Sequence, residues 1–449
     1  MTDVAKWLKN RDPQEKEFHQ AVEKLIAWVQ PVMDRRPDFA QQAILQRLVE
    51  PERSLVFRVP WMDDAGQVQV NRGYRVEMSS VLGPFKGGLR FHPSVSISTF
   101  KALALEQVFK NALTMLPIGG ARGGSDFEPK GKSDNEVMRF CQSFMAELAH
   151  HIGPDTDVPG SGMGVGLREI GYLFGAYRKQ SGKHAAVITG RGIEWGGSQI
   201  RLQSTGYGVV YFATEALSTR NCTLEGQRCL VSGAGNVAQH TVEKIIDLGG
   251  KVLTMSDSSG FIFDAEGIDS SKLAFIKRLK NINRGRIQEY VDKYSEALFV
   301  ETDYSLDHNP IWNHPADCAF PCAAENEINA KDATNLVNQG VQLVCEGADL
   351  PAAPEAIDVF LESGILYAPC TATNAGGEAI AALEMTQNRM LLNWSAREVD
   401  HRLRTVMTNI HRQCLETAEE YGQPGNYVIG AVIAGFTRVV NAMFDQGLV

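Results

Sequence analysis

Three small residues followed by an acid form the clearest chemical pattern in this sequence. Gly233, Gly235 and Ala238 lie between an apolar run and a helical segment, and Asp257 follows Gly233 by 24 positions. This is the G-x-G-x-x-A fingerprint of dinucleotide binding, in which small residues allow a tight turn and close approach of a pyrophosphate to a helix N-terminus. We therefore predict that this segment binds a dinucleotide.

The residues around Asp257 bear on which dinucleotide is bound. A lone acid at this position favours the ribose hydroxyls of NAD, but Ser256 and Ser258 flank the acid here. Lys280 and Arg286 are cations of the kind that a 2′-phosphate requires, although a charge run is also typical of a solvated helix face. The residues alone leave the choice between NAD and NADP open.

A second pattern interleaves cations with glycine. Flexible linkers are rich in serine and glycine and carry few charges, whereas these segments carry cations. We therefore interpret them as loops in which the backbone approaches a bound anion. The segments are residues 82–91, 117–133, 157–169 and 189–198, and they carry Lys86, Arg90, Arg122, Lys130 and Arg191.

The periodicity of the apolar residues predicts the elements that must position these side chains. In the N-terminal half it predicts helices around 18–29, 101–115 and 137–148, and strands over 54–61 and 67–80. After about residue 199, short apolar runs alternate with helical segments, which predicts an α/β fold with parallel strands and crossover helices. The chain then ends in helices from about residue 395. The predicted parallel strands are residues 228–233, 251–257, 317–323, 341–347 and 364–370.

The composition limits the classes of binding partner and the cellular compartment that we expect for this protein. The chain has 449 residues, a formal net charge of −9 and no basic stretch, so we expect no nucleic-acid partner. The first twenty residues are polar, and no uninterrupted apolar run approaches the length of about 18 residues expected of a membrane span. We therefore expect no membrane association. The eight cysteines are scattered through apolar segments, which favours a reducing cytoplasm.

One group of residues invites a metal interpretation. His314, Cys318 and Cys322 carry metal-binding side chains, but no fourth ligand has suitable spacing. The segment 317–323 is better explained as a strand and the loop that follows it. We therefore predict no metal site.

Several segments together resemble the hexameric glutamate dehydrogenases of bacteria, in particular the NADP-preferring type, within the Glu/Leu/Phe/Val dehydrogenase superfamily. The resemblance covers nearly the whole chain in the order and spacing of that family. The segments that carry it are EMSSVLGPFKGGLRFHPS, PIGGARGGSDFEPKGKSDNEVMRFCQ, DTDVPGSGMGVGLREIGY, STGYGVVYF, GAGNVA, SDSSG and NAGGEAIAALEMTQN.

The resemblance implies a Rossmann-type NAD(P)-binding domain over residues 201–423 and an α/β substrate and oligomerisation domain over residues 1–200. Helices from about 424–449 complete the substrate domain. It also implies a cleft that closes on an amino or oxo acid, a homohexamer, and NADP rather than NAD as cofactor. The implied cofactor-binding residues are Thr205, Gly233, Gly235, Asn236, Val237, Ser256, Asp257, Ser258, Lys280, Arg286, Ala323 and Asn374.

The resemblance also assigns substrate positions. Gln107 and Lys110 would hold the α-carboxylate of the substrate, and Lys86 its distal carboxylate. The other substrate positions are Arg201, Glu378 and Ala381.

The same comparison with the family exposes changes at the positions that do chemistry. Arg122 replaces the catalytic lysine, and an arginine with a pKa above about 12 cannot act as a neutral base. Gly162 replaces the proton-transferring aspartate, which we expect to leave extra room or to admit a water. Glu378 and Ala381 replace a small apolar residue and a serine at the distal end of the substrate, and we expect Glu378 to face Lys86 and to disfavour 2-oxoglutarate.

Three hypotheses follow from these changes. The first is an NADP-dependent oxidoreductase that acts on an atypical amino acid and 2-oxo acid pair, with Arg122 as an electrostatic clamp. The second is a catalytically silent protein that binds cofactor or metabolite, or that assembles with an active homologue as a regulatory subunit. The third is a slow glutamate dehydrogenase in which Lys130 or Lys132 substitutes for the missing lysine.

Overall fold

The structure is a computed structural model that describes residues 2–448, and it divides into two compact units. Unit 1 contains the chain up to Arg201, Glu378–Val399 and the chain from Val432 onward. Unit 2 contains Leu202–Gly377 and Asp400–Ala431. These bounds differ from the predicted domains, because residues 378–399 belong to unit 1 and residues 424–431 to unit 2. Helices α15, α16 and α17 run through the unit boundaries without a break, so no turn residue marks them.

Unit 1 is built on a mixed five-stranded sheet with the order β1-β2-β4-β3-β5. The two predicted strands over 54–61 and 67–80 are confirmed, and they form a hairpin in which β1 pairs antiparallel with β2 around a turn at Gly66, where φ is 77°. β4 pairs antiparallel with β2 and parallel with β3, and β3 pairs parallel with β5. The strands are β1 (Arg53–Met62), β2 (Val68–Ser79), β3 (Phe85–Phe91), β4 (Gly120–Ser125) and β5 (Asp157–Gly160).

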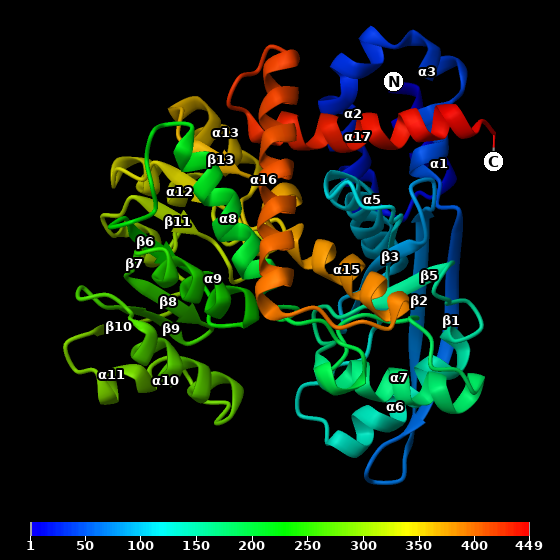
Figure 1. The fold of residues 1–449 in the computed structure, drawn as a ribbon, viewed down its shortest axis with the longest axis horizontal. Coiled ribbons are helices and arrows are strands. Elements are labelled where there is room, and N and C mark those ends of the chain that lie inside the picture. The colour runs from blue at the N-terminus through cyan, green and yellow to red at the C-terminus, as the bar shows by residue number, and fades with distance from the viewer. Residues whose placement is uncertain (1, 449) are drawn as a thin grey trace. The chain divides into compact units, whose positions relative to one another are not determined.

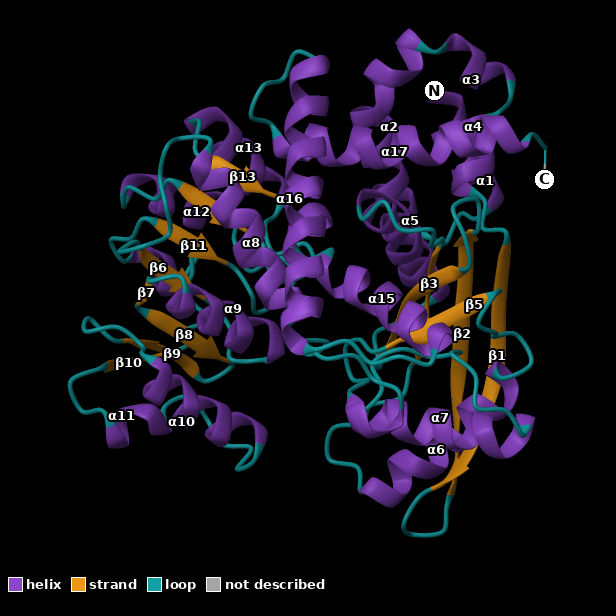
Figure 2. Ribbon diagram, viewed as in Figure 1, coloured by secondary structure: helices purple, strands orange, loops and turns teal. Residues whose placement is uncertain are grey.

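Helices cover this sheet and confirm the predicted helical periodicity. Helix α5 packs against β2 and β4, whereas α6 packs against β1 and α7 (Figure 2). Helix α6 begins at a capping box, in which Ser133 Oγ accepts from the N–H of Glu136 at 3.1 Å and the Glu136 carboxylate accepts from the N–H of Ser133 at 2.9 Å. The helices are α1 (Thr2–Arg11), α2 (Lys16–Arg35), α3 (Pro37–Gln41), α4 (Ile44–Val49), α5 (Ile97–Leu113), α6 (Asp134–Leu148) and α7 (Leu167–Ser181), with a 3-10 turn η1 (Ile193–Trp195).

The prediction that the glycine-rich segments are loops was wrong for the two segments that hold Lys86 and Arg122. These segments form β3 and β4, and their glycines permit close packing inside the protein. A Cβ at Gly87 would lie 1.6 Å from the carbonyl oxygen of Ala121, and one at Gly120 would lie 2.7 Å from the backbone of Val108 in α5. Glycine is therefore required here by strand–strand and helix–strand contact.

Unit 2 contains a parallel sheet with the order β13-β12-β11-β6-β7, which confirms the predicted α/β fold. The chain moves outward from β6 to β7 and then returns to β11 on the other side of β6. The carboxyl ends of β6 and β11 therefore flank a topological switch point, where open α/β sheets bind ligands. The strands are β6 (Arg228–Val231), β7 (Lys251–Val252), β11 (Cys318–Phe320), β12 (Leu343–Cys345) and β13 (Leu366–Ala368).

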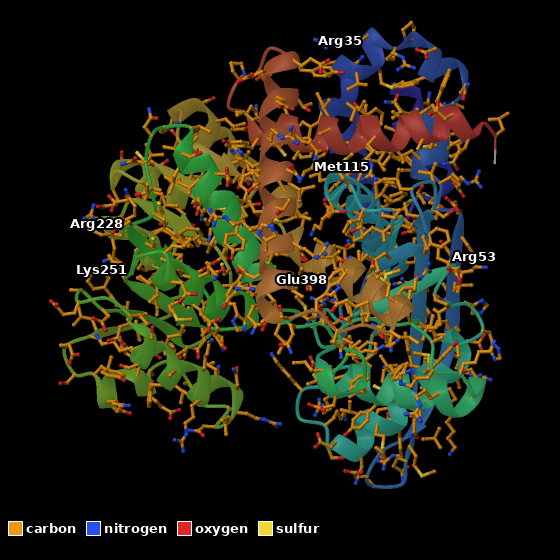
Figure 3. All side chains as sticks on the ribbon, in the orientation of Figure 1. Arg35, Arg53, Met115, Arg228, Lys251 and Glu398 are labelled. Atoms are coloured by element: carbon orange, nitrogen blue, oxygen red, sulfur yellow. The ribbon has the colours of Figure 1, made fainter. Side chains whose placement is uncertain are left out.

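The amino ends of β6 and β7 are marked by Arg228 and Lys251, which are register partners and lie beside each other (Figure 3).

Helices α8 and α9 pack against each other, as do α12 and α13 (Figure 1). The helices of this unit are α8 (Ser204–Ser218), α9 (Asn236–Asp247), α10 (Ser270–Asn281), α11 (Glu289–Lys293), α12 (Ala330–Asn338), α13 (Pro354–Ser363) and α14 (Cys370–Thr373), with a 3-10 turn η2 (Pro310–Asn313).

The run predicted as one parallel strand over 251–257 is two strands. β7 pairs with β6, but β8 (Thr254–Asp257) belongs to an antiparallel sheet with β9 (Gly260–Phe263) and β10 (Leu298–Glu301). The side chain of Thr254 causes the break, because its hydroxyl accepts from the N–H of Val231 at 2.9 Å and donates to the carbonyl of Val231 at 3.1 Å. The hydroxyl replaces the backbone ladder at this point.

Helices α16 (Ala396–Glu420) and α17 (Tyr427–Gln446) confirm the prediction of helices after about residue 395, and α15 (Gly376–Met390) precedes them. By length and composition alone, α17 is apolar enough to cross a membrane. In the structure, 61% of the apolar stretch of α17 is buried inside the protein, which is typical of a core helix.

Candidate active site

The predicted dinucleotide loop lies at the switch point of unit 2. Gly233 follows β6 with a φ of 83°, and its N–H donates to Ser256 Oγ at 2.7 Å. A Cβ at Gly233 would lie 2.9 Å from the carbonyl oxygen of Cys322, so only glycine fits against the loop after β11. Gly235 is the N-cap of α9, and nothing lies within 4 Å of the position of its Cβ. The N-terminal N–H groups of α9 are thus presented to an incoming anion.

Both carboxylate oxygens of Asp257 are engaged within the protein. Oδ2 accepts from Lys280 Nζ at 2.6 Å and from the N–H of Ile287 at 2.8 Å, and Oδ1 accepts from the N–H and the hydroxyl of Ser259 at 2.9 and 2.6 Å. Burial raises the pKa of this carboxyl, but the hydrogen bonds from Lys280 and Ser259 lower it to about 2. A carboxylate occupied in this way has little capacity left for a ribose diol.

Cations and a hydroxyl gather beside that carboxylate. Lys280 donates also to the carbonyl of Gly285 at 2.8 Å, which leaves one of its three N–H donors for a ligand. Arg286 is exposed, and its Nη1 donates to Ser258 Oγ at 2.7 Å. This arrangement suits a phosphate better than a pair of ribose hydroxyls.

The remaining predicted cofactor positions also lie in unit 2. Asn236 is exposed at the start of α9, and its Nδ2 donates to the carbonyl of Leu202 at 2.7 Å. Asn374 donates to Asp349 Oδ1 at 3.0 Å, while its own Oδ1 is buried and has no hydrogen-bond partner in the protein. Thr205 and Val237 are half-buried in α8 and α9, and Ala323 is exposed after β11.

Sequence analysis missed Glu327, which supports the loop after β11. Its Oε1 accepts from the N–H of Ala323 at 2.9 Å. Burial raises the pKa of this carboxyl to about 7. Only its position four residues after Ala323 could have indicated it.

The predicted substrate residues lie in unit 1, and the structure brings Lys86 and Glu378 together. Lys86 projects from β3 with 1% of its side chain exposed, and its Nζ lies 3.7 Å from Glu378 Oε2 on α15. Burial lowers the pKa of Lys86 to about 8, although Glu378 opposes this shift. Burial likewise opposes ionisation of Glu378, but the positive charges of Lys86, Arg122 and Arg201 outweigh it and lower the pKa of that carboxyl. Ala381, one helical turn after Glu378, is fully buried.

The α-carboxylate residues of the prediction lie on α5. Gln107 is fully buried and donates to Asn111 Oδ1 at 2.7 Å, and its own Oε1 has no hydrogen-bond partner. Lys110 is buried on the same helix. Asn111, which sequence analysis missed, donates to the carbonyls of Lys86 at 3.0 Å and Gly119 at 2.5 Å. It therefore ties α5 to the backbone of β3 at Lys86.

Arg122 projects from β4 beside β3. It is half-buried, and its Nε is buried without a hydrogen-bond partner. Its Nη1 would lie 3.2 Å from a Cβ at Gly88, and its charge contributes to the lowered pKa of Glu378. Arg122 thus lies close enough to Glu378 for its charge to act on that carboxylate, and its Nε is a donor that no group of the protein satisfies.

Gly162 does not leave the extra room that the sequence suggested. Its backbone exchanges hydrogen bonds with Val165 at 3.0 and 2.9 Å, which fixes a turn against β3. A Cβ at Gly162 would lie 2.3 Å from the carbonyl oxygen of Leu89. The backbone of β3 therefore fills the space into which a side chain at 162 would project.

Arg191 lies in the glycine-rich segment 189–198, and its guanidinium forms hydrogen bonds inside unit 1. It donates to the carbonyls of Ile188 at 3.0 Å and Ala185 at 2.5 Å and to Asn388 Oδ1 at 3.2 Å. The carboxylate of Glu384 in turn accepts from the N–H groups of Gly190 and Arg191 at 3.1 and 3.3 Å.

A second pair of charges, Arg201 and Glu384, acts on Lys86 in unit 1. Arg201 Nε lies 3.8 Å from Glu384 Oε2, and Arg201 Nη2 donates to Ser161 Oγ at 3.2 Å. Sequence analysis missed Glu384, although it lies on the same helix as Glu378. Arg201 was among the predicted substrate residues, and the structure holds its side chain in this network.

The residues of the rejected metal interpretation have other surroundings. His314 stacks on Phe263 with ring centroids 4.2 Å apart, and Cys318 lies within β11, as predicted for segment 317–323. Within residues 2–448, no three His, Cys, Asp or Glu side chains form a group that could hold a metal ion. All eight cysteines are free thiols.

Comparison with known proteins gives matches over nearly the whole chain. Residues 196–447 match the family described as Glutamate/Leucine/Phenylalanine/Valine dehydrogenase, and residues 51–179 match Glu/Leu/Phe/Val dehydrogenase, dimerisation domain. The chain is 50% identical over 442 residues to the NADP-specific glutamate dehydrogenase of Giardia intestinalis, covering 98% of this chain and 97% of that protein.

Solved structures give the same result. The glutamate dehydrogenase of Plasmodium falciparum superposes with a TM-score of 0.96 at 44% identity, covering 100% of this chain and 95% of that one. A hetero-hexameric glutamate dehydrogenase from Thermus thermophilus in a leucine-bound form superposes with a TM-score of 0.80 at 27% identity, covering 93% and 97% of the two chains.

Proposed function

Because the chain belongs to the Glu/Leu/Phe/Val dehydrogenase family, we propose that it is an NADP-dependent amino-acid dehydrogenase whose preferred substrate is not glutamate. It interconverts an amino acid and its 2-oxo acid. The observation that carries the proposal is the placement of Glu378 3.7 Å from Lys86, where the charge of Arg122 also acts on the Glu378 carboxylate. A carboxylate at this point competes with the distal carboxylate of glutamate for the same ammonium group.

Unit 2 fits the proposed NADP. The N-terminus of α9 and the glycines at 233 and 235 suit the pyrophosphate, and Lys280, Ser258 and Arg286 suit the 2′-phosphate. The unpartnered Oδ1 of Asn374 is an acceptor of the kind that a bound amide satisfies. When bound, the nicotinamide supplies hydride transfer, which is the redox chemistry of the reaction.

Residues of unit 1 would bind and orient the substrate. Lys110 and the unpartnered Oε1 of Gln107 suit the α-carboxylate and the α-amino group of an amino acid. The guanidinium of Arg122 would donate hydrogen bonds to negative charge on a carbonyl oxygen or carboxylate, and an arginine does not serve as a general base. Water must then accept the proton that a lysine or aspartate would otherwise accept, which makes the reaction slow with any substrate.

The reductive direction tests this proposal. NADPH oxidation by the pure protein is followed with ammonia and a panel of 2-oxo acids, and NADPH binding is titrated separately by its fluorescence. We expect NADPH binding, and turnover of another 2-oxo acid that exceeds turnover of 2-oxoglutarate. Turnover of 2-oxoglutarate as the best substrate would contradict the proposal, and absence of NADPH binding would remove its premise.

A second candidate function is a silent regulatory subunit. It is favoured by the loss of both proton-transferring side chains, at Arg122 and Gly162, in a chain that keeps its dinucleotide loop. The relative from Thermus thermophilus is hetero-hexameric, so members of this fold assemble with unlike subunits. NADPH binding without turnover of any 2-oxo acid, together with co-purification of an active homologue, would favour this function.

A slow glutamate dehydrogenase that uses Lys130 or Lys132 has less support. Both lysines are exposed, and Lys132 Nζ lies 5.7 Å from the centroid of the Trp61 ring. Trp61 packs in the aromatic core with Phe127 and Phe140, so Lys132 lies next to that cluster. Neither position suits a base that serves the Lys86 pocket.

We further propose that the protein is a homohexamer and works in the cytoplasm. The match of residues 51–179 to a dimerisation domain supports an oligomer. Free thiols, seven of them buried and Cys222 half-buried, suit a reducing compartment. Light scattering of the pure protein tests the number of subunits.

A further inference from the structure

The distal end of the pocket in unit 1 contains polar atoms that the protein leaves unsatisfied. Glu378 Oε2 is buried and has no hydrogen-bond partner, since Lys86 Nζ, at 3.7 Å, is too far away for a hydrogen bond. Thr189 Oγ1 is buried and also lacks a partner. Buried polar atoms are nearly always paired, so two such atoms beside the buried ammonium of Lys86 indicate a ligand that pairs them.

These groups face the same space. A Cβ at Gly160 would lie 2.7 Å from Thr189 Oγ1 and 3.0 Å from Lys86 Nζ, so the hydroxyl and the ammonium approach one point in the pocket. Glu378 Oε2 lies beside the same ammonium. The pocket thus presents an acceptor that bears a negative charge next to a donor that bears a positive charge, with a hydroxyl nearby.

The charges restrict which side-chain terminus can bind. A carboxylate would pair with Lys86 but would lie beside the carboxylate of Glu378, and an ammonium would pair with Glu378 but would lie beside Lys86. An aliphatic terminus would leave both charges buried and unsatisfied. A primary carboxamide has an acceptor and a donor on one carbon, and it carries no net charge.

We infer that the substrate side chain ends in a primary carboxamide, whose oxygen accepts from Lys86 and whose NH2 group donates to Glu378 Oε2. Thr189 Oγ1 offers a second donor to the same oxygen. This inference rests on the proposed function, because it assumes that the pocket of unit 1 binds the amino acid. Glu378 is then the residue that discriminates between an amide and a carboxylate at the end of the substrate side chain.

The test compares amino acids that differ only at the side-chain terminus. L-glutamine, L-glutamate, L-norleucine and L-lysine, with L-asparagine as a shorter amide, are offered with NADP+, and NADPH formation is followed. Binding of the same compounds is measured by calorimetry in the absence of turnover. We expect an amide to be preferred over L-glutamate by at least about 100-fold in both kcat/KM and affinity, because unsatisfied or like-charged termini are strongly rejected.

Variants at position 378 test the role of that carboxylate. Glu378→Gln removes the charge at nearly constant shape, so we expect the preference for an amide over L-glutamate to fall at least 10-fold. Glu378→Val is a second variant, in case the first fails to fold, and we expect it to favour L-glutamate. Glu355→Gln, at an exposed position on α13, is the matched control and should leave the preference unchanged.

The outcomes separate the two proposals. Binding of an amide with the stated preference but without turnover would support the pocket assignment and contradict the dehydrogenase. Turnover of an amino acid without preference for an amide, or an unchanged preference in both Glu378 variants, would overturn the inference and leave the dehydrogenase standing. Absence of binding and of turnover with every compound would contradict both.

Discussion

Lys280 Nζ lies 2.6 Å from Asp257 Oδ2, and the N–H of Ile287 donates to the same oxygen at 2.8 Å. The acid of the dinucleotide fingerprint is therefore used to hold a lysine in place. In NAD-binding proteins the equivalent acid binds the ribose hydroxyls. The same residue type at the same position thus favours a different coenzyme, because of residues that lie 23 and 30 positions further along the chain.

The first prediction concerns this coenzyme choice. Arg286→Ala should weaken NADPH binding about 10- to 100-fold and leave NADH binding nearly unchanged, because a charge-assisted hydrogen bond to the 2′-phosphate is lost. Fluorescence titration with both coenzymes measures the effect. Arg278→Ala, an exposed cation in the last turn of α10, is the control. Equal weakening of both coenzymes by Arg286→Ala would place the residue outside the phosphate site.

The second prediction concerns pH. Burial lowers the pKa of Lys86 from 10.5 to about 8 in the folded protein, so the unfolded chain binds more protons than the folded one between these values. The free energy of unfolding should rise with pH across this window, by about 3 kcal/mol relative to Lys86→Met. The groups that act on Lys86 are Glu378, Glu384, Arg201 and Arg75. Urea unfolding of both proteins at several pH values measures the difference, and parallel pH profiles would refute the shift.

The third prediction concerns Gly162. Gly162→Asp should lower the free energy of unfolding by about 1–3 kcal/mol, because the Cβ would lie 2.3 Å from the carbonyl oxygen of Leu89 and β3 would have to move. Gly175→Ala in α7 is the matched control, since nothing lies within 4 Å of its Cβ position. There alanine should stabilise the helix by roughly 0.5–1 kcal/mol. Thermal unfolding distinguishes the two, and a fully stable Gly162→Asp protein would show that β3 adapts easily.

The fourth prediction concerns a buried ion pair in unit 1. Arg75 and Asp157 are fully buried, and Arg75 Nε donates to Asp157 Oδ2 at 2.7 Å. Arg75→Met should cost about 3–5 kcal/mol of stability, because it leaves the carboxylate of Asp157 buried without its partner. The double variant with Asp157→Leu should cost less than the sum of the single changes. At the exposed pair between Arg228 and Asp317, Arg228→Met should cost at most about 1 kcal/mol. Strictly additive losses at the buried pair would argue against direct coupling.

The fifth prediction tests whether the chemistry can be restored. In a Glu378→Val background, Arg122→Lys should increase reductive amination of 2-oxoglutarate at least about 10-fold, because a lysine can lose a proton where an arginine cannot. The gain should be larger at higher pH, as the new amine becomes neutral. Lys130→Arg, at an exposed position, is the control for a general effect of cation type. No gain at any pH would favour the silent regulatory subunit.

The elements with strong local signals could be predicted from the sequence. The dinucleotide loop is local, because the turn, the helix N-terminus and the acid lie within one strand–helix–strand segment. Apolar periodicity likewise predicted a helix around 137–148, and in α6 the apolar residues Val137, Cys141 and Leu148 are fully buried. Such signals depend only on the order and spacing of residues within one segment.

Other features depend on contacts between distant segments and could not be predicted in this way. Glycine at 87 and 120 suggested loops. In the structure, glycine is required at 87 because the carbonyl of Ala121 lies close by, and at 120 because the backbone of Val108 does. Thr189 and Asn111 both lie close to Lys86, and these contacts depend on where β3 runs in the fold. The separation of β7 from β8 depends on a single hydroxyl, that of Thr254, which no periodicity reveals.

The chain passes from one unit to the other four times, after residues 201, 377, 399 and 431. No single cut in the gene therefore separates two segments that could each encode a complete unit. Recombination between related genes would exchange whole units only through several coordinated crossovers. Point substitutions within one unit are the simpler route by which a protein with this connectivity acquires a new specificity.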